Sequence, residues 1–195
     1  MTDDLPLGRF VTKIEPRATW DDLVLPASEL DLLHQIADQV RGRSTADEDW
    51  SFGGPKRRGS GASVLFAGAS GAGQSTAAEV LARALGFSLY RIDLSTAVSK
   101  YIGETEKNLR RVFDAANESN AILFFDEADA LFGKRSEVKD SHDRYANIKV
   151  DDLRELFGAF RGVIILATEA ADALAVEVLG PGTFLVKFDV PGQPR

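Results

Sequence analysis

The fold is decided by the stretch Gly68-Ala69-Ser70-Gly71-Ala72-Gly73-Gln74-Ser75-Thr76. The stretch follows a short apolar run at residues 62–67 and precedes an alanine-rich helical pattern at residues 75–85. A phosphate-binding (Walker A) loop has the pattern G-x-x-x-x-G-K-[ST] between a strand and a helix, because glycines let backbone N–H groups surround phosphate oxygens and the helix N-terminus adds partial positive charge. Gly68, Gly73 and Ser75 match this pattern, but position 74 is Gln instead of Lys. The stretch predicts a phosphate-binding loop without its lysine; the alternative is a plain glycine-rich turn.

A second motif lies at the end of a later apolar run, residues 121–125, which is followed by Asp126 and Glu127. In P-loop nucleotide hydrolases the Asp at this (Walker B) position holds Mg²⁺ together with the loop Ser or Thr, and a neighbouring Glu polarises the attacking water. We therefore predict Ser75 and Asp126 as the magnesium residues, and Asp126 and Glu127 as the catalytic carboxylates. Alone, the pair could equally be a solvated acidic turn; the glycine-rich loop upstream favours the functional interpretation.

The order of elements after residue 61 predicts the fold class. Predicted strands cover residues 62–67, 87–93, 121–126, 163–168 and 184–189, and predicted helices cover residues 75–85, 105–116 and about 143–160. Strands that alternate with helices predict a parallel sheet covered on both faces, and nearly continuous apolar strands suit that burial. We expect an α/β fold: a three-layer α/β/α P-loop core with a five-stranded parallel sheet over residues 62–195.

Residues 1–61 are predicted to form an N-terminal extension with an amphipathic helix and a linker. The helix is indicated by Ser28, a candidate N-cap, and by the apolar spacing of Leu30, Leu33, Ile36, Ala37 and Val40. Residues 42–61 are rich in Gly, Ser, Asp, Lys and Arg, which is typical of a surface connection. The basic triplet at residues 56–58 fits a solvated loop better than a binding patch.

Composition limits the size and the class of the protein. A chain of 195 residues that is 44% hydrophobic is long enough for one ordinary domain. The net charge of -7, with acidic and basic residues interleaved, offers no broad basic face for nucleic acid. The absence of cysteine excludes disulfides, thiolate metal sites and cysteine nucleophiles. The acidic start predicts no secretory signal, and no apolar run is long enough for a membrane span, so we expect a cytoplasmic protein.

Together with residues 99–113, these motifs resemble those of the AAA+ ATPases. The resemblance is greatest to bacterial AAA ATPases encoded beside phage-tail-like contractile injection systems. It is nearly letter for letter at residues 14–26, 90–94 and 125–147, and it covers residues 12–169 most strongly. The resemblance implies ATP or ADP with Mg²⁺ as ligands, a hexameric ring, and a protein client.

The resemblance also assigns two positions outside the motifs. Tyr101-Ile102-Gly103 falls at the family's pore loop, where an aromatic side chain grips a polypeptide in the central channel of the ring. Without the family, Tyr101 would be an ordinary aromatic between a strand and a helix. Val24 falls where family members contact adenine. The implied nucleotide-binding residues are thus Val24 and the loop residues 68–76.

Four parts of the family's hydrolysis machinery are missing from the sequence. Gln74 replaces the loop lysine, and Glu169 stands where a sensor Asn follows the fourth strand. Residues 179–184 offer no arginine to reach a neighbouring subunit's γ-phosphate, and the small helical lid with its second sensor arginine is not found after residue 191. A lost charge-assisted bond costs roughly 1.5–3 kcal/mol, and an arginine finger supplies about 10³–10⁵ in rate. Because Gln74 keeps a neutral amide donor, binding is expected to weaken rather than vanish.

We therefore expect an ATP/ADP-binding module with impaired or absent hydrolysis, acting as a binding or assembly component, monomeric or weakly oligomeric when isolated. One alternative is an active AAA+ ATPase that remodels or threads a protein client, with the missing charges supplied by Lys100, Arg110, Arg111 or a partner subunit. Another, a P-loop GTPase or small-molecule kinase, is disfavoured because no N-K-x-D guanine motif exists. His34 and His142 are interpreted as surface residues on helices.

Overall fold

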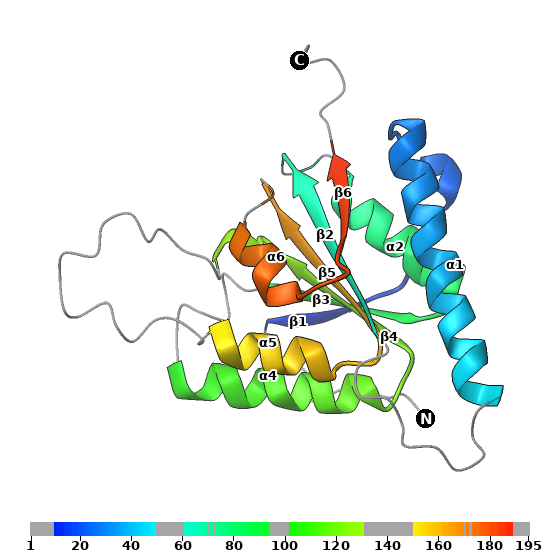
Figure 1. The fold of residues 1–195 in the computed structure, drawn as a ribbon. Helices are drawn as coiled ribbons and strands as arrows, with labels where there is room; N and C mark the ends of the chain where they lie inside the picture. The colour runs from blue at the N-terminus through cyan, green and yellow to red at the C-terminus, as the bar shows by residue number, and fades with distance from the viewer. Residues whose placement is uncertain are drawn as a thin grey trace.

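The computed structural model describes residues 10–49, 61–69, 71, 73–93, 102–130, 150–169, 171 and 173–188 (Figure 1). The elements in chain order are β1 (Val11–Ile14), η1 (Trp20–Asp22), α1 (Ala27–Asp49), β2 (Ala62–Gly68), α2 (Gln74–Leu85), β3 (Ser88–Asp93), α4 (Ile102–Asn117), β4 (Ala121–Asp126), η2 (Ala128–Ala130), α5 (Val150–Ala159), β5 (Val163–Thr168), α6 (Ala173–Leu179) and β6 (Phe184–Phe188). None of the described helices combines the length and the apolar character that crossing a membrane requires.

The strands form one six-stranded sheet in the order β1-β3-β4-β5-β2-β6. The five strands from β2 to β6 are parallel, as predicted, and β1 adds an antiparallel edge strand beside β3 that the sequence did not indicate. Because β5 lies between β4 and β2, its carboxyl end is flanked by the carboxylates that end β4 and by the glycine-rich loop that follows β2. This is the edge where ligands of open α/β sheets bind.

Alternate strand residues face two separate helical layers, so the predicted three-layer α/β/α fold is confirmed. On one face, Val64 and Phe66 of β2 pack with apolar residues of α1 and α2. On the other, Leu65 packs with α4, α5 and α6. Figure 1 shows the two groups of helices on opposite sides of the sheet. Helix α1 therefore contributes Leu33 and Ile36, both fully buried, to the same core as the phosphate-loop strand.

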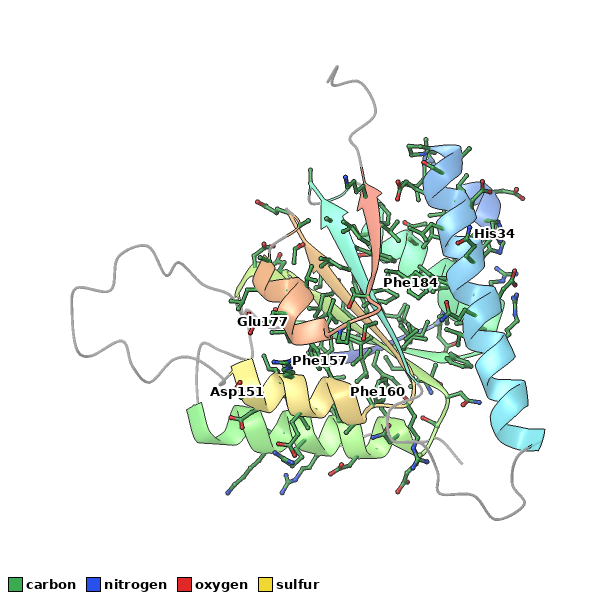
Figure 2. The ribbon with its side chains drawn as sticks, viewed as in Figure 1. His34, Asp151, Phe157, Phe160, Glu177 and Phe184 are labelled. Atoms are coloured by element: carbon green, nitrogen blue, oxygen red, sulfur yellow. The ribbon has the colours of Figure 1, made fainter. Side chains whose placement is uncertain are left out.

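An aromatic cluster fixes β4, the strand that ends in Asp126. The ring of Phe113 on α4 lies 6.0 Å from that of Phe125, 5.7 Å from that of Phe157 and 5.4 Å from that of Phe160, measured between centroids. Phe157 and Phe160, labelled in Figure 2, come from α5 and the residue that follows it. Such pairs stabilise a core beyond their buried area. The cluster holds the helices against β4.

Several predicted boundaries differ from the structure. Helix α1 begins at Ala27, directly after Pro26, whose carbonyl accepts the N–H groups of Glu29 and Leu30. Ser28 lies inside the helix, so its prediction as N-cap is wrong. The helix also continues to Asp49, beyond the predicted start of the connection at residue 42. Helix α6 was not predicted because its seven residues are too few to give a clear helical period.

Candidate functional site

The glycine-rich loop leaves β2 at Gly68 and enters α2 at Gln74. A Cβ atom at Gly68 would lie 2.1 Å from the carbonyl oxygen of Phe188, so the close approach of β2 and β6 requires glycine there. Gly71 and Gly73 have φ values of 84° and 97°, in the left-handed region that favours glycine. The glycines therefore let the chain turn sharply into the helix, while Ser70 and Ala72 lie outside the described residues.

The N-terminus of α2 is suited to an anion. Gly73 occupies the N-cap position, no side chain caps the helix there, and no acidic residue lies in its first turn. The first N–H groups of a helix are otherwise unpaired and carry partial positive charge. Ala69 and Ser75 are exposed beside this end and Thr76 is half-buried. The loop residues predicted from sequence are thus arranged around one helix N-terminus, apart from the two that the structure does not describe.

Gln74 differs from its expected role as a phosphate donor. Its side chain is buried, and its Nε2 donates to the carbonyl oxygens of Gly68 at 3.0 Å and Thr168 at 3.2 Å. A carboxamide nitrogen has two hydrogens, and both partners are acceptors, so both hydrogens are used. The side chain points to these carbonyls because buried carbonyl oxygens at the ends of strands require hydrogen-bond donors. The side chain of Gln74 therefore ties the end of β2 to the end of β5 and keeps no Nε2 hydrogen for phosphate in this conformation.

Both oxygens of Asp126 are engaged at the end of β4. Its Oδ2 lies 2.5 Å from Nη2 of Arg91 on β3, and its Oδ1 accepts the backbone N–H of Glu127 at 3.0 Å. Glu127 itself is exposed and has a φ of 52°, an uncommon value for a residue other than glycine. Sequence reasoning found the two carboxylates but missed Arg91, because the pairing depends on the register of β3 and β4.

A cavity of about 330 Å³ joins the loop to these carboxylates. Its lining residues come from four segments and are Gly68, Gln74, Asp126, Glu127, Asp129, Ala167, Thr168 and Glu169. The N–H of Glu169 donates to Oδ2 of Asp129 at 3.0 Å, which links the turn after β4 to the end of β5. Among the described residues, the lining includes four carboxylates and neither lysine nor arginine. Glu169 thus lies at the same cavity as Asp126 and Glu127, as its position after β5 predicts.

A second cavity of about 230 Å³ also borders the loop. It is lined by Asp22, Leu23, Val24, Leu25, Gly71, Gly73 and Thr76. Val24 is 78% exposed, a large fraction for an apolar side chain in a packed domain. The structure therefore brings Val24, assigned to adenine by resemblance, next to the phosphate-binding loop.

The segment before Val24 is attached to α2 by polar contacts that the sequence did not reveal. The N–H groups of Arg17 and Ala18 donate to Oε2 of Glu79 at 3.0 and 3.4 Å. Nη1 of Arg83 donates to the carbonyl oxygen of Arg17 at 2.6 Å. These partners are separated by more than 60 residues, so only the fold brings them together. Helix α2 thus positions one wall of the second cavity.

The same segment is stiffened locally. The backbone N–H and hydroxyl of Thr19 donate to Oδ2 of Asp22 at 2.7 and 2.9 Å, and these bonds hold the pKa of Asp22 below its usual value. The rings of Trp20 and His34 are stacked with centroids 3.8 Å apart. His34 is exposed on α1, as predicted (Figure 2). The turn that precedes Val24 is therefore held by the bonds between Thr19 and Asp22 and by the stacking of Trp20 on His34.

Other predicted residues lie away from the cavities or outside the described chain. Tyr101, Lys100 and His142 lie outside the described residues. Arg110 and Arg111 are exposed on α4, which covers the face of the sheet opposite α2. Thr183 closes a turn at the amino end of β6, where its hydroxyl donates to the carbonyl of Gly180 at 2.7 Å.

The residues present fit a magnesium ion only in company with a phosphate ligand. Ser75 and Asp126 offer hydroxyl and carboxylate oxygens, the ligands that Mg²⁺ prefers. No group of three or more His, Cys, Asp or Glu side chains in the described part of the chain is arranged to hold a metal. A magnesium ion here would therefore depend on phosphate oxygens and water for its remaining ligands, as is usual at nucleotide sites.

Comparison with known proteins agrees with this geometry. The model of the ATPase family associated with various cellular activities (AAA) matches residues 64–191, more than half of the chain. The chain belongs to the AAA family. Proteins of this family bind ATP or ADP, typically with Mg²⁺, and form oligomeric rings.

Curated AAA relatives are similar over most of this chain. The chain is 31% identical over 187 residues to the uncharacterized AAA family ATPase y4kL of Sinorhizobium fredii, an alignment that covers 93% of this chain and 53% of the relative. It is 32% identical over 175 residues to the peroxisomal ATPase PEX6 of Kluyveromyces lactis and of Saccharomyces cerevisiae, covering 87% of this chain and 17% and 16% of those proteins. The chain thus spans about half the length of the first relative and about a sixth of the others.

Proposed function

We propose that this AAA domain binds ATP or ADP at the carboxyl edge of its sheet, hydrolyses ATP slowly or not at all, and acts as a binding or assembly module. The observation that carries the proposal is the environment of Gln74. The residue stands at the lysine position of the loop, and its amide hydrogens bond Gly68 and Thr168. The site keeps its loop, its helix N-terminus and Asp126, but position 74 and the other described lining residues provide no side-chain cation to contact the β- and γ-phosphates.

The two cavities suggest how the nucleotide lies. We assign the phosphates to the N-terminus of α2, between the loop and Asp126, and the base to the second cavity beside Val24. Gly71 and Gly73 line the second cavity while Gly68 and Gln74 line the first, so a ligand that spans both would follow the loop. Backbone N–H groups of the loop and helix are the donors for the phosphate oxygens.

The charge of the first cavity opposes the triphosphate more than the diphosphate. Asp126, Glu127, Asp129 and Glu169 line it, and a γ-phosphate adds further negative charge among them. A missing charge-assisted bond costs roughly 1.5–3 kcal/mol, or about ten- to a hundredfold in affinity. Hydrolysis also requires stabilisation of the charge that develops on the transferred phosphoryl group, and the described lining residues offer no cation for it. We therefore expect ADP to bind at least as tightly as ATP.

A second candidate function is an active AAA ATPase that remodels or threads a protein client. Asp126 and Glu127 at the end of β4 favour it, because these two residue types serve metal binding and water activation in P-loop hydrolases. Similarity to the peroxisomal ATPase PEX6 and the sequence resemblance to ATPases of contractile injection systems both favour a protein partner. In this case a partner subunit supplies the missing cation.

Calorimetric titration with ADP and ATP, with and without Mg²⁺, tests the proposal. We expect binding of both nucleotides, an Mg²⁺-dependent gain in affinity, and loss of that gain in Ser75→Ala. Ser63→Ala is the matched control, because Ser63 lies near the amino end of β2, away from the loop. Failure of both nucleotides to bind would contradict the nucleotide site, and rapid heat release from continuing hydrolysis would favour the second candidate.

A further inference from the structure

We propose that Arg91 serves as an internal counterion of Asp126, which holds the carboxylate when no metal is bound and competes with Mg²⁺ for it. The inference rests on the proposed nucleotide function, and it adds a competition for Asp126 that neither the family match nor the motifs describe. It makes the metal affinity of the site depend on a residue of β3.

The contact between the two side chains is direct. Nη2 of Arg91 lies 2.5 Å from Oδ2 of Asp126, so the two groups form a direct charge-assisted contact. The remaining oxygen, Oδ1, accepts the N–H of Glu127. Each oxygen keeps a further lone pair, so a divalent ion at Asp126 competes with these donors for the charge of the carboxylate rather than for the last free site. Arg91 is the donor that can move away, because its side chain is 48% exposed and the other donor is backbone.

Strand register explains why the two residues meet. In the parallel pair β3 and β4, Arg91 is opposite Phe124, and Asp93 is opposite Asp126. Arg91 and Asp126 are therefore diagonal neighbours on one face of the sheet, a separation that a long side chain spans. Leu89 and Phe124 of this face pack in the cluster that includes α2, so Arg91 lies on the same face of the sheet as the phosphate-loop helix. The contact between Arg91 and Asp126 can therefore break by a movement of the Arg91 side chain, without a change in the pairing of the strands.

The negative charge of the neighbouring cavity makes the contact between Arg91 and Asp126 relevant to metal binding. In the part of the chain that the structure describes, four carboxylates line the cavity without a lysine or arginine among them, and Arg91 neutralises one of the four from outside the lining. Arginine and Mg²⁺ are both cations, and both require the oxygens of Asp126. Occupation by one therefore disfavours the other, both by repulsion and by competition for the same atom.

The expected effect is modest because the pair is partly exposed. Ion pairs of this kind contribute roughly 0.2–1 kcal/mol, so removal of the arginine should tighten divalent metal binding by a factor of roughly 1.4 to 5. The test is a titration of the full chain with Mn²⁺, followed by electron paramagnetic resonance of the free ion, in the presence of saturating ADP. We expect Arg91→Gln to bind Mn²⁺ more tightly than the parent chain. Arg41→Gln is the control, because it removes the same charge from a surface ion pair with Asp38 and should leave Mn²⁺ affinity unchanged.

A double-mutant cycle makes the test specific. In an Asp126→Asn background, Arg91→Gln should give a smaller change in Mn²⁺ affinity, because the carboxylate for which Arg91 and the metal compete is gone and only the repulsion by Arg91 remains. Equal Mn²⁺ affinity in the parent chain and Arg91→Gln would overturn the proposal, and so would weaker binding in Arg91→Gln or no Mn²⁺ binding by any variant. Failure of the proposed function is distinguished by a separate titration with ADP in the absence of metal, which does not depend on Arg91 releasing Asp126.

Discussion

The amide nitrogen of Gln74 lies 3.2 Å from the carbonyl oxygen of Thr168, so the side chain at the lysine position of the loop links the start of α2 to the end of β5. Its second acceptor is Gly68, the first glycine of the loop. The residue that departs most clearly from the family's phosphate-loop pattern thus has a structural role. Substitutions of Gln74 should therefore affect the stability of the fold, the nucleotide affinity and the rate of hydrolysis to different degrees.

Gln74→Lys should tighten nucleotide binding without restoring hydrolysis. A lysine ammonium can bond phosphate oxygens and recover roughly 1.5–3 kcal/mol, which corresponds to tenfold or more in affinity. Turnover should stay slow, since Glu169 and the other carboxylates still line the cavity. Titration with ADP and ATP and a coupled phosphate-release assay measure the two effects. Gln35→Lys, the same change on the exposed face of α1, is the control; unchanged affinity in Gln74→Lys would show that the loop does not hold phosphate.

Gln74→Glu should destabilise the fold. The substitution keeps the size of the side chain but removes both amide hydrogens and sets a carboxylate against two carbonyl oxygens. Loss of a buried donor costs about 1–3 kcal/mol, and more when the replacement is charged. Denaturant unfolding should show this decrease in the free energy of unfolding, whereas Gln35→Glu on the surface should change it by less than about 0.5 kcal/mol. Equal stability of the two variants would mean that the link between β2 and β5 is not formed in solution.

Gly68→Ala and Gly158→Ala should have opposite effects on stability. A Cβ atom at Gly68 would meet the backbone of Phe188, whereas at Gly158, inside α5, it would meet nothing within 4 Å. Overpacking at Gly68 should cost roughly 1–3 kcal/mol or more. Alanine at this exposed position in the last turn of α5 should add up to roughly 0.5–1 kcal/mol. Thermal unfolding measures both, and a neutral Gly68→Ala would contradict the tight approach of β2 to β6.

Glu79→Ala should weaken nucleotide binding by disturbing only the cavity assigned to the base. Glu79 holds the backbone of Arg17 and Ala18, which leads into the wall of the second cavity. Loss of these bonds should lower ADP affinity by about 0.5–1.5 kcal/mol, or about two- to tenfold. Affinity for inorganic tripolyphosphate, which has no base, should not change. Glu155→Ala on the exposed face of α5 is the control, and an equal loss for ADP and tripolyphosphate would refute a role limited to the base.

The sequence predicted the features that depend on local pattern. The spacing of Gly68, Gly73 and Ser75 predicted the strand, loop and helix, and apolar runs predicted all five parallel strands. It did not predict β1, because that strand has four residues and only Val11 among them is buried. The end of α1 was misjudged because residues 42–49 have the composition of a loop, although they continue a helix whose earlier turns pack on the core.

The site was predictable in its residue types but not in its contacts. The carboxylates Asp126 and Glu127 could be read from their place after an apolar strand. The partner of Asp126 could not, because its contact with Arg91 requires knowledge of which strands are neighbours and in which register. The direction of the Gln74 side chain also depends on β5, which lies far along the chain. Side-chain partners of this kind are set by tertiary structure rather than by local sequence.

The most direct test of the account is the fate of ATP bound to the chain. Protein in excess of radiolabelled ATP and Mg²⁺ would be quenched with acid at successive times, and the bound nucleotide separated into ATP and ADP. The account predicts that ATP binds and is recovered largely intact over many minutes. Conversion of the bound ATP at about 1 s⁻¹ or faster, the range of ordinary enzymes, would contradict the claim that this AAA site binds nucleotide but has lost efficient hydrolysis.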